Sequence, residues 1–158
     1  MSQGGPLWQA PASLGGLAVY RNGVADGGGS FVEYNMDDVA GTTLTTSGVI
    51  LFDSGGSDGS YANNENYTVT FQASASQTVQ ATMTFCEVEA YYMEGVTFSD
   101  NGVPITNKIS GSGSNSTGFW SSHSLPYVVQ SSSNVMQISF RSDGSINDAG
   151  FRIEVIFQ

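Results

Sequence analysis

Apolar and polar residues alternate one by one over two long stretches of this chain. From Tyr67 to Ala73, and again from Val79 to Phe85, every second residue is apolar and the residues between them are Thr or Gln. Successive side chains of a β-strand point to opposite sides, so this alternation indicates strands with one buried face. No stretch shows a convincing helical period. The sequence therefore predicts an all-β protein in which the apolar residues of both stretches, Phe85 included, face the core.

Further strands are expected at 17–20, 30–34, 135–140 and 151–157. The pair Asn22-Gly23 and the three glycines at 27–29 have the turn chemistry that joins antiparallel strands. Several short strands separated by such turns predict a β-sandwich of two packed antiparallel sheets.

Three regions follow from this pattern: an extended N-terminal arm at residues 1–16, additional strands or a hairpin at 17–46, and the main sandwich at 47–158. The arm carries Gly, Pro and Ser around Leu7 and Trp8. Because an arm that carries a Trp usually packs against a protein surface, we expect this arm to pack either on its own domain or on a neighbouring subunit.

The charge balance excludes several classes of partner. The chain has fourteen acidic and four basic residues, which gives a formal net charge of -10. Nucleic acid and anionic membrane surfaces are not expected as partners, because both require a basic footprint. No apolar run approaches the ~18 residues of a membrane span, and the first residues lack the pattern of a signal peptide. Cys86 is alone, so no intrachain disulfide forms, and its neighbours predict a buried structural thiol.

Two separated stretches place short oxygen-bearing side chains between apolar runs. One carries Glu87, Glu89 and Glu94, and the other runs from Phe140 to Phe151. If the strands beside them pack together, both stretches converge on one hard cation. Calcium suits such loops because it accepts roughly six to eight oxygen ligands in a loose geometry. Solvated loop carboxylates are the alternative, but like charges held close together repel unless a cation or hydrogen bonds offset them.

From about Ser47 onward, the order of the motifs resembles a CUB domain. The resemblance is carried by a Gly-rich opening, a Tyr-Ala-Asn-Asn stretch, a strand ending in Phe before an acidic loop, and a closing Phe-Arg-Ser-Asp-Gly-Ser segment that leads to Gly-Phe; these are residues 53–59, 61–69, 85–89, 140–145 and 150–151. Ala62, Tyr67 and Val69 stand where the family usually has Pro, Cys and Trp, and the second family disulfide is also missing. The chain therefore resembles a disulfide-free relative.

This resemblance implies a jelly-roll β-sandwich that recognises protein or glycan and has no catalysis of its own. It also implies a calcium site. Carried over position by position, the ligands are Glu89, Glu94 and Asp143, with Ser145 and Asn147 adding backbone or side-chain oxygens. Glu94 replaces the usual Asp, and Glu87 competes with Glu89 for its role.

Other motifs admit competing interpretations. The offsets of Asp143, Ser145, Asn147 and Glu154 suggest an EF-hand, but Asp148 stands where that loop needs Gly. Ser57 lies in a Gly-x-Ser-x-Gly pattern without a following helix, and the only imidazole that could serve it as a base is His123. Asn66 and Asn115 begin formal glycosylation motifs, while Phe119-Trp120 is either a core plug or an exposed contact.

We expect a non-enzymatic structural or adhesive protein that forms a homo-oligomer or part of a larger assembly. Only 11% of the residues are charged, and the polar character comes mostly from Ser, Thr, Asn, Gln and Gly, which predicts a neutral-polar surface. This surface, the arm, and the lack of a signal peptide and of disulfides favour a virion component, such as a capsid decoration or tail protein that contacts other capsid or tail proteins. The alternative is a calcium-dependent extracellular module of a larger secreted protein, which binds protein or glycan.

Overall fold

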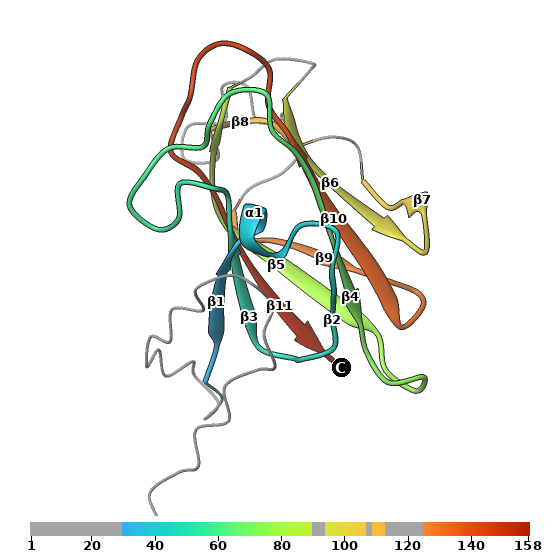
Figure 1. Cartoon of the computed structure of the whole chain (residues 1–158). Coiled ribbons are helices and arrows are strands. Elements are labelled where there is room, and N and C mark those ends of the chain that lie inside the picture. Colours follow the sequence, from blue (N-terminus) through green and yellow to red (C-terminus); the bar gives the residue numbers. More distant parts are fainter. Residues whose placement is uncertain (1–29, 90–93, 107–108, 113–124) are drawn as a thin grey trace, which may run out of the picture.

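Two β-sheets face each other in the computed structural model of the protein (Figure 1). The structure describes residues 30–89, 94–106, 109–112 and 125–158. Several predictions lie outside these residues: the arm at 1–16, the strand at 17–20, the turn sequences before Ser30, and those for His123, Asn115 and Phe119-Trp120. Within the described part, no helix is long and apolar enough to cross a membrane.

The first sheet has the strand order β1-β3-β11-β5-β8, and β9 also pairs with β5. Its strands are β1 (Val32–Asn35), β3 (Val49–Phe52), β5 (Val79–Val88), β8 (Gly111–Ser112), β9 (Tyr127–Gln130) and β11 (Gly150–Phe157). The second sheet has the order β2-β4-β10-β6-β7. Its strands are β2 (Thr43–Leu44), β4 (Asn66–Gln72), β6 (Gly95–Asp100), β7 (Val103–Pro104) and β10 (Val135–Arg141).

The predicted all-β sandwich is confirmed, but each sheet carries one parallel pair at its edge. β1 runs parallel to β3, and β2 runs parallel to β4. The one-turn helix α1 (Met36–Val39) carries the chain from β1 in the first sheet to β2 in the second, and the chain then returns to the first sheet as β3. Because the chain alternates between the sheets here, strands two steps apart become parallel neighbours. The two sheets are therefore mixed rather than purely antiparallel.

The core lies between the two inner faces, and the alternating residues fill it as predicted. Val69 and Phe71 of β4 face Val79, Ala81 and Met83 of β5 across a core in which all five side chains are buried. β11 contributes the apolar face that the sequence predicts. Phe151, Ile153 and Val155 are buried, and Phe157 packs against the core.

The alternation of β5 breaks near its end, and the predicted position of Phe85 is wrong. Phe85 is 38% exposed. A register shift causes this, because Arg152 of β11 pairs with Phe85 while Ile153 pairs with Met83, which leaves Thr84 as an extra residue. The extra residue turns Phe85 outward and Cys86 inward. The Cys86 thiol is buried as predicted, and that burial raises its pKa to about 12.

Asp53 fixes the loop after β3 to the start of β11. Its carboxylate is fully buried and accepts hydrogen bonds from the backbone N–H of Gly55 (2.8 Å) and of Phe151 (3.0 Å). Burial raises the pKa of Asp53 to about 6, although these two hydrogen bonds act in the opposite direction.

In the presence of a chelator, the protein is expected to lose stability as the pH rises from about 4 to about 6. The folded pKa of Asp53, about 6, lies above its ordinary value of 3.8. The fold therefore favours the protonated acid, so the stabilisation is complete below the unfolded pKa and is lost as the pH passes the folded pKa. A shift of roughly two units corresponds to about 3 kcal/mol. Thermal unfolding measured across this range checks the prediction.

The matched variant for this pH series is Asp53→Asn, which cannot titrate at this position. Its melting temperature should be lower at acidic pH but should vary less between about pH 4 and pH 6 than that of the wild type. A wild-type melting temperature that stays constant or rises over this interval would contradict the assignment.

Candidate metal centre

Three loop ends meet at one end of the sandwich. Arg141 of β10 pairs with Gly95 of β6, and Gly150 of β11 pairs with Glu87 of β5. The residue after β5, the residue before β6 and the loop from β10 to β11 are therefore neighbours. Figure 1 shows this last loop arching over the end of the two sheets.

The predicted acidic residues Glu89, Glu94 and Asp143 come together there. One carboxylate oxygen from each lies within 4.8 Å of the other two. Glu94 is fully buried, while Glu89 and Asp143 are half-buried. The backbone N–H of Asp143 donates to Oε1 of Glu94 at 2.9 Å. The long side chain of Glu94 thus reaches the loop after β10 from beneath.

Tyr61 organises this cluster, and the sequence analysis did not assign it a role in the site. Its hydroxyl donates to Oε2 of Glu94 at 2.8 Å and accepts the backbone N–H of Glu89 at 3.0 Å. The ring is buried edge-on against Phe140, with ring centroids 5.2 Å apart. One hydroxyl therefore links the residues on either side of the loop between β5 and β6. The only signal in the sequence was that Tyr61 opens the Tyr-Ala-Asn-Asn stretch.

The segment that carries Tyr61 is joined to the loop that carries Asp143. Asn64 donates its backbone N–H to the carbonyl of Asp143 at 2.6 Å. Glu65 and Ser142 exchange two bonds, from the N–H of Glu65 to the Ser142 hydroxyl (2.9 Å) and from the N–H of Ser142 to the carbonyl of Glu65 (3.0 Å). These bonds fix the position of Asp143 relative to Glu94. The Asn-Asn and Phe-x-Ser-Asp motifs therefore act as one support for the cluster.

The cluster brings three carboxylates close together. Burial, followed by the nearby carboxylates of Glu94, Asp143 and Asp148, raises the pKa of Glu89. Oε2 of Glu89 is buried and has no hydrogen-bond partner among the residues that the structure describes. Among the described residues, no lysine or arginine forms an ion pair with these carboxylates; Arg152 pairs with Glu154. A buried carboxylate oxygen without a donor, next to two more carboxylates, fits a hard divalent cation such as calcium.

The remaining predicted ligands are placed differently. The N–H and hydroxyl of Ser145 both approach Oδ1 of Asp143, at 2.9 and 3.3 Å, so Ser145 orients that carboxylate here. Asn147 is exposed on the same loop. Within the described residues, the cluster includes Glu89 and not Glu87, which lies in β5 opposite Gly150. Ligand roles for Ser145 and Asn147 stay predictions.

The structure around the other motifs does not support an EF-hand or a hydrolase elbow. The loop after Asp143 is flanked by β10 and β11, not by the helices of an EF-hand. Ser57 lies in a run of turns, and the next element after it is β4 rather than the helix of a hydrolase elbow. Asn66 begins β4 and is exposed, and whether it carries a glycan stays a prediction.

Comparisons with known proteins agree with this architecture. The family model described as CUB domain matches residues 41–155. A solved structure of the CUB1-EGF-CUB2 domains of rat MASP-1 is similar, with a TM-score of 0.63 and 20% identity over 74% of this chain and 42% of that chain. The full extracellular region of zebrafish Gpr126/Adgrg6 gives a TM-score of 0.57 and 23% identity over 73% of this chain and 14% of that one.

A third similar structure contains the metal. The crystal structure of the MASP-1 CUB2 domain bound to Ca2+ matches with a TM-score of 0.57 and 14% identity, over 74% of this chain and 98% of that chain. A search among curated proteins found no match. This chain spans less than half the length of the two larger structures above.

Fold and site together define a β-sandwich recognition module with an acidic cluster at one end. The chain belongs to the CUB domain family, whose model covers most of its length. CUB domains are protein- or ligand-binding modules typical of extracellular proteins, and they are generally non-catalytic.

Proposed function

We propose that this chain is a non-enzymatic, calcium-dependent recognition module that binds a protein ligand through the loops around Glu89, Glu94 and Asp143. The observation that carries the proposal is the approach of one oxygen from each of these three carboxylates to within 4.8 Å of the other two. One buried oxygen of Glu89 also has no donor among the described residues. The calcium-bound MASP-1 CUB2 structure gives additional support, since it shares the fold.

Calcium, when bound, supplies positive charge and oxygen coordination that offset the repulsion among these carboxylates. The chain's own residues position the ligands. Tyr61 holds Glu94 and the backbone of Glu89 in place, and the backbone N–H of Asp143 is held by Glu94. Binding of the ion would hold together the loops that carry Glu89, Glu94 and Asp143. Those loops are the surface that a partner meets.

Thermal unfolding with calcium and with a chelator tests the proposal. At a dissociation constant near the weak extracellular range of ~0.1 to 1 mM, a tenfold excess of calcium adds about 1.4 kcal/mol. The melting temperature should rise by about 3 to 6 °C. Magnesium at the same concentration should give a smaller rise, because it requires a tighter octahedral geometry and gives up its water reluctantly. Equal melting temperatures in calcium and in chelator would refute the proposal.

Assembly into a larger particle, including the virion role with capsid or tail partners, stays a prediction. It depended chiefly on the arm at residues 1–16, which lies outside the described residues. The acidic cluster favours the calcium-dependent module instead. Homo-oligomer formation and glycan binding likewise stay predictions.

A further inference from the structure

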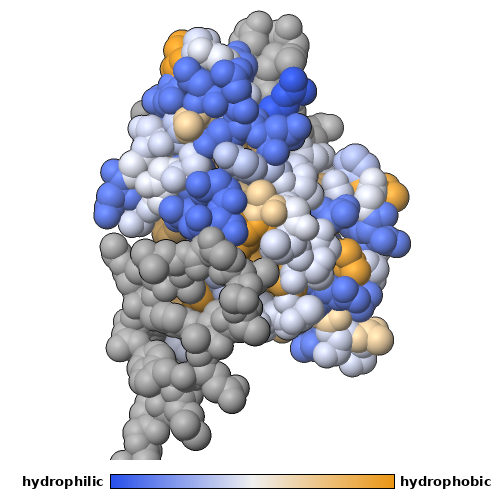
Figure 2. Space-filling model, viewed as in Figure 1, coloured by the Kyte–Doolittle hydropathy of each residue, from blue (hydrophilic) through white to orange (hydrophobic). Residues whose placement is uncertain are grey.

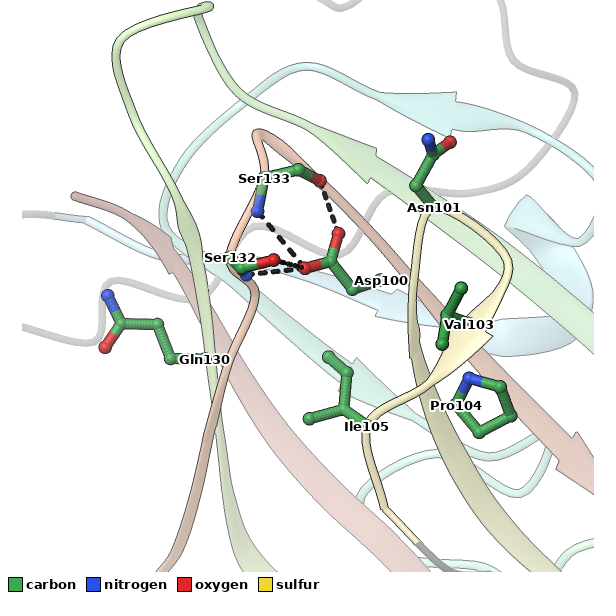
Figure 3. Close-up of a pocket in the computed structure, with 8 residues that line it drawn as sticks. All are labelled: Asp100, Asn101, Val103, Pro104, Ile105, Gln130, Ser132 and Ser133. Carbon is green, nitrogen blue, oxygen red and sulfur yellow. Dashed lines mark hydrogen bonds between the residues drawn. The ribbon is translucent and has the colours of Figure 1, made fainter.

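A pocket lies at the other end of β6, away from the acidic cluster. It has a volume of about 520 Å³ and is lined by the β6–β7 hairpin on one side and by the turn between β9 and β10 on the other. Figure 3 shows the residues that line it: Asp100, Asn101, Val103, Pro104, Ile105, Gln130, Ser132 and Ser133. Glu94 and Asp100 flank and end β6, and at about 3.3 Å per residue they are roughly 20 Å apart along the strand.

The Asp100 carboxylate is a fixed negative charge in this pocket. Its Oδ2 accepts the N–H (2.5 Å) and hydroxyl (2.6 Å) of Ser132 and the N–H of Ser133 (3.1 Å). Its Oδ1 accepts the Ser133 hydroxyl. The Ser132 and Ser133 hydroxyls, with the two backbone donors, lower the pKa of Asp100 to about 2. The group is therefore ionised at any physiological pH.

All of these donors are neutral, so they hold the charge of Asp100 in place without neutralising it. Within the described part of the chain, no basic side chain forms an ion pair with Asp100. Only the Ser133 hydroxyl donates to Oδ1 there, and a carboxylate oxygen has two lone pairs. An additional donor can therefore approach Oδ1 without displacing the bonds that hold the turn.

Apolar side chains beside Asp100 are exposed to solvent. Val103 is 68% exposed and Ile105 is 37% exposed, and both lie on the β6–β7 hairpin (Figure 3). Figure 2 shows apolar surface bordered by hydrophilic residues on the side where Figure 1 places β7. A carboxylate next to an apolar wall matches a side chain that has an aliphatic stem and a cationic end.

We propose that this pocket binds a lysine or arginine side chain of a protein partner, with its stem on Val103 and Ile105 and its charged end at Asp100. Charge complementarity selects this occupant, because the pocket presents an ionised carboxylate and the whole chain carries a formal net charge of -10. The pocket is independent of the metal cluster at the opposite end of β6. It provides a second binding surface whose occupancy does not require calcium.

Amide NMR of the full chain in chelator tests the proposal with two small probes. Nα-acetyl-lysine methylamide carries the cation, whereas Nα-acetyl-norleucine methylamide has the same stem without it. The lysine probe should shift the amides of Ser132, Ser133 and Ile105 in a saturable way, with a dissociation constant on the order of millimolar to tens of millimolar. The norleucine probe should shift them at least about threefold less at equal concentration. Adding calcium should leave these shifts unchanged.

Three variants separate the charge, the apolar wall and the fold. Asp100→Asn should weaken binding of the lysine probe by at least about fivefold, whereas Asp37→Asn, an exposed acid in α1, should not change it. Because Asp100→Asn also disturbs the turn, Ile105→Thr provides a second variant that keeps the carboxylate. It should weaken binding by about twofold to threefold. Equal shifts with norleucine, shifts confined to Asp143 and Ser145, no shifts, or unchanged affinity in Asp100→Asn would each overturn the proposal.

Discussion

Replacing Gly150 with alanine is expected to lower the free energy of unfolding by more than about 3 kcal/mol. Gly150 has a φ of +88°, a conformation that costs other residues about 1 kcal/mol or more. A Cβ built there would lie 1.7 Å from Oδ2 of Asp53, which is fully buried. The carboxylate would have to move and would release the N–H groups of Gly55 and Phe151, at a cost of about 1 to 3 kcal/mol for each group left unpaired.

Gly102→Ala is the matched control for this substitution. Gly102 has a nearly identical φ of +85°, but no atom of the described residues lies within 4 Å of the position that its Cβ would take. It should therefore show the backbone strain alone, about 1 kcal/mol. Urea unfolding at a fixed calcium concentration measures both variants. If Gly150→Ala costs no more than Gly102→Ala, the buried carboxylate is not the constraint that we describe.

Replacing Glu94 with glutamine is expected to raise the dissociation constant for calcium by at least about tenfold. The change removes one negative charge from the centre of the cluster but keeps the shape of the side chain. The oxygen of the new Gln side chain can still accept the N–H of Asp143. Its NH2 group can donate to the hydroxyl of Tyr61. That hydroxyl can then donate to the carbonyl of Ile146, which lies 3.4 Å away. Stability in chelator should therefore remain within about 1 kcal/mol of the wild type.

Melting temperatures recorded over a range of calcium concentrations give this dissociation constant. Glu87→Gln removes the same charge two residues from Glu89, outside the cluster, and should change the affinity by less than about twofold. If Glu87→Gln weakens calcium binding as much as Glu94→Gln does, general electrostatic attraction rather than coordination holds the ion.

The sandwich could be predicted from the sequence because β4, most of β5 and β10 alternate between buried and more exposed residues. This pattern of burial produces the period of two in the sequences of β4 and β5. Within these two strands, the predicted alternation ends where the extra residue Thr84 turns Phe85 outward. The bulge at Thr84 could not be predicted from the residues around it, because it depends on how β5 pairs with β11. The parallel edge pairs escaped prediction for a similar reason: they depend on the path of the chain between the sheets.

The acidic cluster was predicted only in part. Glu89, Glu94 and Asp143 could be named because the motif order resembles the CUB domain, and folding brings them together. The roles of Tyr61 and Asp53 were missed, because a buried tyrosine hydroxyl or carboxylate acquires its function from partners far away in the sequence. Tyr61 reaches Glu94 across 33 positions, and Asp53 reaches Phe151 across 98.

The central claim is that folding builds one calcium site from loops distant in sequence, and calorimetric titration of calcium into the chelator-treated chain tests it most directly. We predict one ion per chain with a dissociation constant on the order of 0.1 to 1 mM, and no measurable binding in a variant that combines Glu94→Gln with Asp143→Asn. Absence of binding heat in the wild type, or binding that persists in this double variant, would contradict the claim.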